Sequence, residues 1–169
     1  MKVNISSVKK ELGSRQPFTF DFDAADLFEK DETTWIYGSV RVEGLVVNTG
    51  KTLEVQGLVK AVAELSCNRC LVAFQSDFEI PFRESCRQDG ADQEQAEDSL
   101  LYCTGDEIEL SELVREAVVL AEPLKAVCRE NCKGLCSRCG VNLNISSCKC
   151  EQNVIDPRLA ALEQLLRKD

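Results

Sequence analysis

The sequence contains no histidine. Imidazole is the commonest general base near neutral pH, so its absence removes the usual partner of a catalytic serine or cysteine. The chain also lacks a phosphate-cradling glycine loop and the glycine-flanked turn of a serine nucleophile. Its spacing singles out no pair of carboxylates for acid and base work. These absences predict a protein that is not an enzyme and has no small-molecule substrate.

Long apolar segments are also absent. No stretch approaches the roughly 18 consecutive apolar residues of a membrane span. Residues 1–13, MKVNISSVKKELG, have no apolar core typical of a secretory signal. We therefore expect a cytoplasmic protein without membrane contact. Thiols stay reduced in that compartment, so closely spaced cysteines favour metal binding, and a disulfide scaffold is the alternative.

Cysteine, by contrast, is plentiful, with ten in the chain. Two residues separate Cys67 from Cys70 and also Cys136 from Cys139, the spacing at which one tight turn presents two sulfurs to a single ion. Tetrahedral Zn²⁺ is the ion that best accepts four thiolates. A first site is therefore predicted from the downstream cysteines: Cys136, Cys139, Cys148 and Cys150.

The remaining clustered cysteines suggest a second site. If the first site closes, two pairs are left, namely Cys67 with Cys70 and Cys128 with Cys132. Together they would clip the upstream pair to the downstream segment, giving two structural zinc ions per chain. The alternative is one zinc with an idle upstream pair. Cys86 and Cys103 belong to neither set, and we expect ordinary small apolar residues or exposed thiols there.

Alternating hydrophobicity indicates β-strands in the first half. Phe18, Phe20 and Phe22 alternate with polar residues, and further strands are expected over 35–47 and 53–65. Alternation resumes over 77–82, which places the upstream cysteine pair at a hairpin tip. A thioredoxin-like redox pair is the alternative, but no βαβ pattern surrounds it.

Two helices and a loop complete the prediction. Ser111 is a candidate cap for a helix over about 111–121, which covers one face of the β-structure and is stopped by Pro123. Residues 87–99 are expected to form an acidic loop, and 154–169 an amphipathic helix. The fold class is α+β: an antiparallel β-rich domain with a covering helix (1–121), a cysteine-rich zinc module (122–153) and a short C-terminal helix (154–169).

Charge constrains the partners. The formal net charge is −9, and an acidic surface gives no general affinity for nucleic acid. From Glu122 onward, however, the sequence contains eight Lys and Arg but only six Asp and Glu. The cysteine-rich stretch therefore supplies a small set of candidate RNA or partner contacts: Arg129, Lys133, Arg138 and Lys149.

Several of these motifs occur in a fixed order. A strand ending in CNRCLVAF is followed by ELSELVREAVVLAEPLKAVC, then CKGLCSRCGVNLN and IDPRLAALEQLL. This order resembles the YceD family of bacteria and plastids, described as large ribosomal RNA subunit accumulation proteins. The resemblance spans roughly residues 53–166 and is only loose in the N-terminal third.

The resemblance implies a role in the accumulation or processing of 23S ribosomal RNA, and no catalytic residue can be carried over from the family. The implied partner is the pre-50S particle, met through a basic ribosomal protein or through 23S ribosomal RNA. One alternative is a thiol/zinc redox-responsive regulator or chaperone-like protein. A zinc-ribbon adaptor of transcription is a further alternative, supported by cysteine spacing alone.

Overall fold

The computed structural model describes residues 1–28, 35–87 and 103–150. These residues form antiparallel β-sheets with one short α-helix, which confirms the α+β class. Contacts divide the chain into two compact units. The sheet unit comprises Met1–Leu65 with Phe74–Leu124, and the cysteine unit comprises Ser66–Ala73 with Lys125–Asp169, described as far as Cys150. The upstream cysteine pair therefore belongs to the same unit as the downstream cysteines.

The elements follow one another in simple order along the chain. A very short strand comes first, the four long strands follow it, and two further very short strands precede the single α-helix of the described residues. The bounds are β1 Lys2–Asn4, η1 Val8–Lys10, β2 Arg15–Asp23, η2 Ala24–Asp26, β3 Ile36–Asn48, β4 Thr52–Ser66, β5 Ala73–Arg87, β6 Cys103–Thr104, β7 Glu107–Glu109 and α1 Ser111–Leu120.

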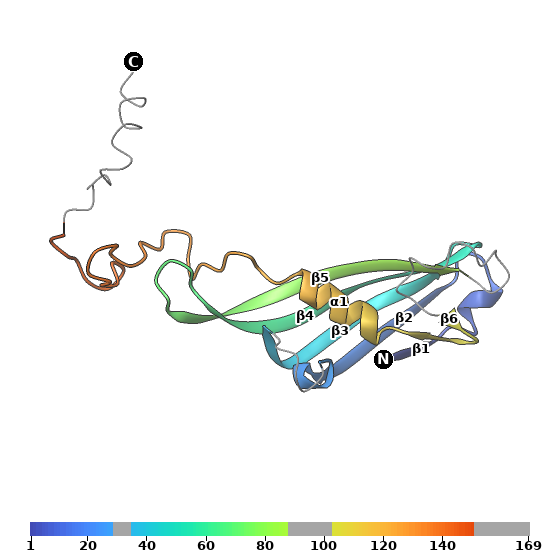
Figure 1. Ribbon diagram of the computed structural model, residues 1–169. Helices are drawn as coiled ribbons and strands as arrows, with labels where there is room; N and C mark the ends of the chain where they lie inside the picture. Colours follow the sequence, from blue (N-terminus) through green and yellow to red (C-terminus); the bar gives the residue numbers. More distant parts are fainter. Residues whose placement is uncertain (29–34, 88–102, 151–169) are drawn as a thin grey trace, which may run out of the picture. The chain divides into compact units, whose positions relative to one another are not determined.

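The main sheet has the strand order β2-β3-β4-β5 (Figure 1). Strand β3 pairs antiparallel with both β2 and β4, so that Phe18 lies opposite Gly44 and Val46 lies opposite Val55. Inward residues such as Val42, Val55 and Val59 are fully buried, and their neighbours in sequence face outward. The strands predicted from alternation are thus confirmed.

Helix α1 covers the inner face of this sheet. Leu113, Val114 and Val118 are buried in the same core as the strands, and Trp35 Nε1 donates to the Val118 carbonyl at 2.9 Å. The helix is confirmed, but its predicted cap is wrong. Leu110 occupies the cap position, and Ser111 is the first helical residue, whose hydroxyl donates to Glu109 at 2.7 Å.

Two glycines bring strands β3 and β4 together with aromatic rings. Gly44 and Gly57 lie directly opposite each other in the strand register. A Cβ on Gly57 would stand 2.4 Å from Cζ of Phe82 and 2.7 Å from the Glu43 carbonyl oxygen. A Cβ on Gly44 would likewise stand 2.6 Å from Cζ of Phe18. Both rings therefore occupy space that only a glycine leaves open.

The predicted acidic loop 87–99 is wrong at its first residue, because Arg87 is the last residue of β5; its other residues, 88–99, and the predicted C-terminal helix 154–169 lie outside the described residues. Cys86 is buried and disulfide-bonded, so the expectation of an ordinary small apolar residue or an exposed thiol there is wrong. Among the helices that the structure describes, none combines the length and hydropathy needed to cross a bilayer.

Candidate metal centres

The first cysteine pair lies in a tight turn at the tip of the β4–β5 hairpin. The Cys67 amide donates to the Val72 carbonyl at 3.0 Å, and the Leu71 amide donates back to the Cys67 carbonyl at 2.8 Å. Leu71 has a φ of 59°, a left-handed conformation that is uncommon for a leucine. This sharp reversal places Cys67 and Cys70 on the same side of the turn, with both residues buried.

The downstream pair repeats the same turn. The Cys136 amide donates to the Val141 carbonyl at 2.9 Å, and the Gly140 amide donates to the Cys136 carbonyl at 2.9 Å. Gly140 has a φ of 71°, close to that of its counterpart Leu71. The two segments also share a sequence pattern, CNRCLV and CSRCGV. The cysteine unit therefore contains two copies of one knuckle, as the shared cysteine spacing predicted.

Backbone bonds tie the first knuckle to the downstream chain within the cysteine unit. Asn68 donates its amide to the Ala126 carbonyl at 2.8 Å, and Leu135 donates to the Arg69 carbonyl at 2.9 Å. The Arg69 guanidinium adds bonds to the carbonyls of Glu130 at 3.0 Å and Cys132 at 3.1 Å. Segments separated by about sixty positions are thereby held in register.

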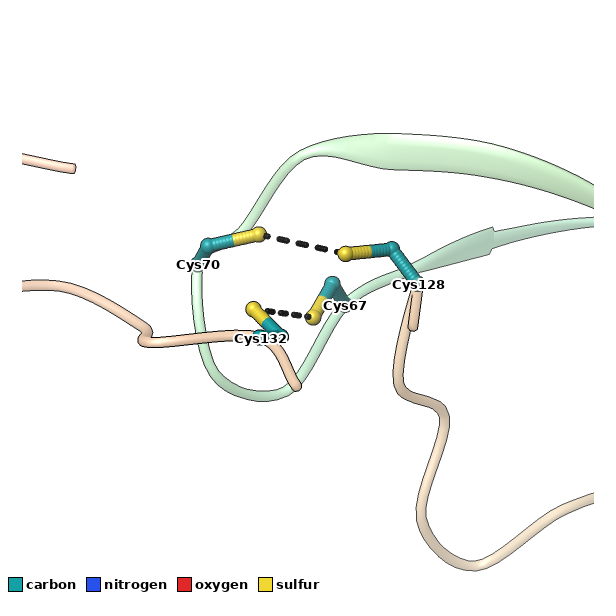
Figure 2. Close-up of side chains that lie close together, drawn as sticks. All are labelled: Cys67, Cys70, Cys128 and Cys132. Carbon is teal, nitrogen blue, oxygen red and sulfur yellow. Dashed lines mark hydrogen bonds between the residues drawn. The ribbon is translucent and has the colours of Figure 1, made fainter. Parts of the chain in front are cut away.

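Four sulfur atoms meet where these segments join. Figure 2 shows Cys67 and Cys70 on the hairpin tip facing Cys132 and Cys128 from the downstream segment. Cys67 Sγ lies 3.8 Å from Cys132 Sγ, and Cys70 Sγ lies 3.8 Å from Cys128 Sγ. All four sulfurs lie within 4.8 Å of one another, and three of the four residues are buried. We call this set the upstream tetrad.

A second set of four forms around the second knuckle. The sulfurs of Cys136, Cys139, Cys148 and Cys150 also lie within 4.8 Å of one another. Cys136 is buried, but Cys139 is exposed and the other two are half-buried. We call this set the downstream tetrad, which is the more accessible of the two.

The spacing of the sulfurs distinguishes a metal site from a disulfide. A zinc–sulfur bond of about 2.3 Å in a tetrahedron puts neighbouring sulfurs about 3.8 Å apart. The upstream tetrad shows this separation between Cys67 and Cys132 and between Cys70 and Cys128. A disulfide would bring two sulfurs to about 2.05 Å, and all eight of these cysteines are free. The donor set thus fits a tetrahedral, thiolate-binding ion.

The thiols within each tetrad differ in acidity. A backbone hydrogen bond from Cys128 lowers the pKa of Cys67 to about 6, and one from Cys139 lowers the pKa of Cys136 to about 6. Burial, followed by hydrogen bonds with neighbouring thiols, raises the pKa of Cys128 to about 12. A hydrogen bond with Cys139, together with burial, raises the pKa of Cys150 to about 12. Without metal, each tetrad therefore retains protons at pH 7, and a bound cation would displace them.

Asn144 supports the upstream tetrad from outside it. Its Nδ2 donates to Cys132 Sγ at 3.3 Å, while its Oδ1 accepts from the Lys133 amide and from Arg129 Nη2, both at 2.9 Å. A donor aimed at a thiolate stabilises the charged sulfur and fixes its direction. Sequence reasoning missed this residue, because an asparagine in a turn has no distinguishing spacing.

Replacing this asparagine tests the upstream tetrad without removing a ligand. We expect Asn144→Ala to weaken zinc binding there by about 10- to 100-fold, the usual effect of losing such an outer contact. Competition with a chromogenic chelator measures the affinity. Ser146→Ala is the matched control, because Ser146 is exposed and its amide donates to the Asn142 carbonyl, a bond that the substitution retains. Equal affinities for Asn144→Ala and the unaltered protein would contradict the assignment.

The four candidate contact cations are all exposed on the cysteine unit. The Arg129 guanidinium donates to the Asn144 side chain. Lys133 donates to the same side chain through its backbone amide. Arg138 lies within the second knuckle, at the position that Arg69 occupies in the first knuckle. The Arg69 guanidinium donates to backbone carbonyls. In the described residues 66–73 and 125–150, Glu130 is the single acid beside six Lys and Arg.

Comparison with known proteins adds a family match. The profile of the family described as "Large ribosomal RNA subunit accumulation protein YceD" matches residues 55–166. A relative from Zea mays, named large ribosomal RNA subunit accumulation protein YCED homolog 1, chloroplastic, is 33% identical over 59% of this chain. The protein of that name from Arabidopsis thaliana is 28% identical over 77% of the chain.

The share of each relative's length that this chain spans differs between the relatives. This chain spans 44% and 50% of the length of the maize and Arabidopsis proteins. The uncharacterized protein YlbN of Bacillus subtilis (strain 168) is 28% identical over 92% of this chain and 91% of its own length. No solved structure matches the chain.

Proposed function

Since the chain belongs to the YceD family, we propose that it supports the accumulation or processing of 23S ribosomal RNA during assembly of the large ribosomal subunit. The family match over residues 55–166 carries this proposal, and it includes all eight cysteines of the two tetrads. The maize and Arabidopsis relatives carry the same description in their names. The setting we propose is the cytoplasm.

We propose that two zinc ions hold the cysteine unit together, one in each tetrad. Four thiolates fill a tetrahedral zinc ion and leave no position for a reactive water, so the metal would be structural. Each filled site carries a charge of −2, which offsets much of the excess of Lys and Arg around it. The protein would then act as a non-enzymatic binding factor whose metal shapes a surface.

Charge favours a basic ribosomal protein as the direct partner on the pre-50S particle. The sheet unit contains 24 Asp and Glu against 11 Lys and Arg, which attracts cationic proteins and repels phosphate. The second docking mode uses the exposed cations of the cysteine unit, Arg129, Lys133, Arg138 and Lys149, on 23S ribosomal RNA. Docking through a basic ribosomal protein is preferred, because the described residues of the cysteine unit offer few exposed cations that could displace the counterions of RNA.

Deleting the gene tests the function. The expected result is a lower ratio of 23S to 16S ribosomal RNA, restored when the intact gene is returned. The ratio is measured on total RNA from cells in balanced growth. Unchanged 23S levels in the deletion strain would contradict the proposal.

A neutralising variant separates the two docking modes. Replacing Arg129, Lys133, Arg138 and Lys149 by glutamine should leave association with pre-50S particles and the restored 23S level intact, because docking through protein does not need them. Loss of both, with zinc content unchanged, would show that these cations contact RNA.

One observation favours a second candidate, a thiol/zinc redox-responsive regulator. Cys139 of the downstream tetrad is exposed, so an oxidant can reach this thiol directly. Oxidation would release the ion and unfold the second knuckle. Normal 23S levels in the deletion strain, combined with zinc release by dilute peroxide, would support this function instead.

A further inference from the structure

A groove lies between helix α1 and the edge strand β5 of the sheet unit. Ile80, Pro81 and Phe82 line its strand side, and Leu113, Ala117 and Leu120 line its helix side. Its volume is about 410 Å³. Because β5 is the last strand in the sheet order, no further strand of the described chain covers this edge. The groove is therefore open along this edge, and apolar side chains make up most of its lining, with Arg83, Glu84 and Glu116 beside them.

Large apolar side chains are exposed at the end of α1, and one of them, Leu120, lines the groove. Leu120 is 78% exposed and Val119 is 52% exposed. Leu124, just beyond the helix, is fully exposed. Clustered exposure of this kind marks an interaction surface more often than isolated apolar residues do.

The groove also contains a buried carboxylate oxygen. Oε2 of Glu116 is buried and has no hydrogen-bond partner among the described residues. The other charged side chains of the groove are engaged, since Arg83 pairs with Glu54 and Glu84 accepts from the Ser85 amide at 2.9 Å. A buried carboxylate oxygen without a donor is costly unless a cation or donor arrives.

The helix end adds negative potential at the same place. The carboxyl end of a helix carries partial negative charge, which cationic side chains commonly compensate. The last turn of α1 contains no basic residue, and Leu120 and Ala121 of this end line the groove. Together with Glu116, this end offers an apolar slot with two uncompensated negative features.

We propose that this groove binds a segment of a partner protein that carries lysine or arginine next to aliphatic or aromatic side chains. The apolar side chains would seat against Phe82, Ala117 and Leu120, and the cation would reach Glu116. A second copy of this chain is a poor occupant, because the sheet unit's excess of acids would repel itself. The inference rests on the proposed function in one respect, that basic ribosomal proteins supply such segments.

A library of peptides in solution tests the groove independently of ribosomal RNA levels. The probe is a set of overlapping 15-residue peptides that covers the large-subunit ribosomal proteins, and binding of the full chain is measured by fluorescence anisotropy. We expect the bound peptides to combine Lys or Arg with apolar residues. Leu120→Asp and Glu116→Gln should each weaken their binding about tenfold or more. Leu12→Asp is the control, because Leu12 is 73% exposed and does not line the groove.

Each other outcome overturns the inference. It fails if no peptide binds, or if the two groove variants bind like the Leu12 control. Binding that appears only after removal of residues 154–169 would make this chain's own C-terminal segment the occupant. Self-association that Leu120→Asp abolishes would make a second copy the occupant. If gene deletion lowers 23S but the groove variants bind normally, the proposed function stands and the groove assignment alone is wrong.

Discussion

Replacing one ligand cysteine should unfold the surrounding knuckle and leave the sheet unit folded. Structural zinc contributes an apparent 10–16 kcal/mol, roughly, in small sites at pH 7. That is as large as the whole stability of a typical domain, about 5–15 kcal/mol. In its described residues, 66–73 and 125–150, the cysteine unit contains no α-helix and only one isolated β-bridge besides its knuckles. Little else there can compensate for the loss of a zinc ion.

The two tetrads should respond separately. Cys136→Ser should remove one zinc and the amide protection of Gly140 and Leu143, whose hydrogen bonds close the second knuckle. Cys67→Ser should remove the other zinc and free the Leu71 and Leu135 amides. Hydrogen exchange with mass spectrometry measures both patterns.

The control is a change inside a knuckle that spares the ligands. Ser137→Ala lies between the cysteines of the second knuckle, is exposed, and should retain both zinc ions and the full protection pattern. If Cys67→Ser also left zinc content and amide protection unchanged, the upstream tetrad would not be a metal site.

Gly57→Ala should destabilise the sheet unit by about 2–3 kcal/mol, in the range for overpacking a tight site. The added methyl would stand 2.4 Å from the Phe82 ring and 2.7 Å from the Glu43 carbonyl oxygen, so strand or ring must move. Urea denaturation followed by the fluorescence of the single tryptophan measures the loss, because Trp35 bonds to helix α1 on this sheet.

A double-mutant cycle identifies the cause. Phe82→Leu replaces the ring by a shorter side chain. By itself this change should lower the stability, but combined with Gly57→Ala it should recover about 1 kcal/mol of the stability lost. Strict additivity of the two changes would place the cost in the backbone at Glu43. A Gly57→Ala protein as stable as the original would contradict the close approach of strand and ring.

The strands and the helix could be predicted from sequence because one face of each is buried. Phe18, Phe20 and Phe22 alternate with polar residues, and Leu113, Val114 and Val118 recur at helical spacing. The start of the helix at residue 111 was predicted correctly, but its cap was misplaced by one residue. Ser111 is the kind of residue that caps helices, but here its hydroxyl bonds to Glu109, a contact that depends on the turn after β7.

The cysteine sets could be predicted from spacing, but their arrangement could not. Knuckle spacing pairs Cys67 with Cys70, whereas which downstream cysteines face them depends on the fold of the connecting segments. The contributions of Asn144 and Arg69 arise from bonds between distant positions, which no local pattern announces. Cys86 shows the same limit, since nothing in its neighbourhood predicts a disulfide.

Zinc content combined with X-ray absorption tests the central claim most directly. Protein purified without chelator should contain two zinc ions per chain, each surrounded by four sulfurs at about 2.3 Å. The eight cysteines of the two tetrads supply those sulfurs. One zinc per chain, none, or oxygen and nitrogen ligands in place of sulfur would contradict the account.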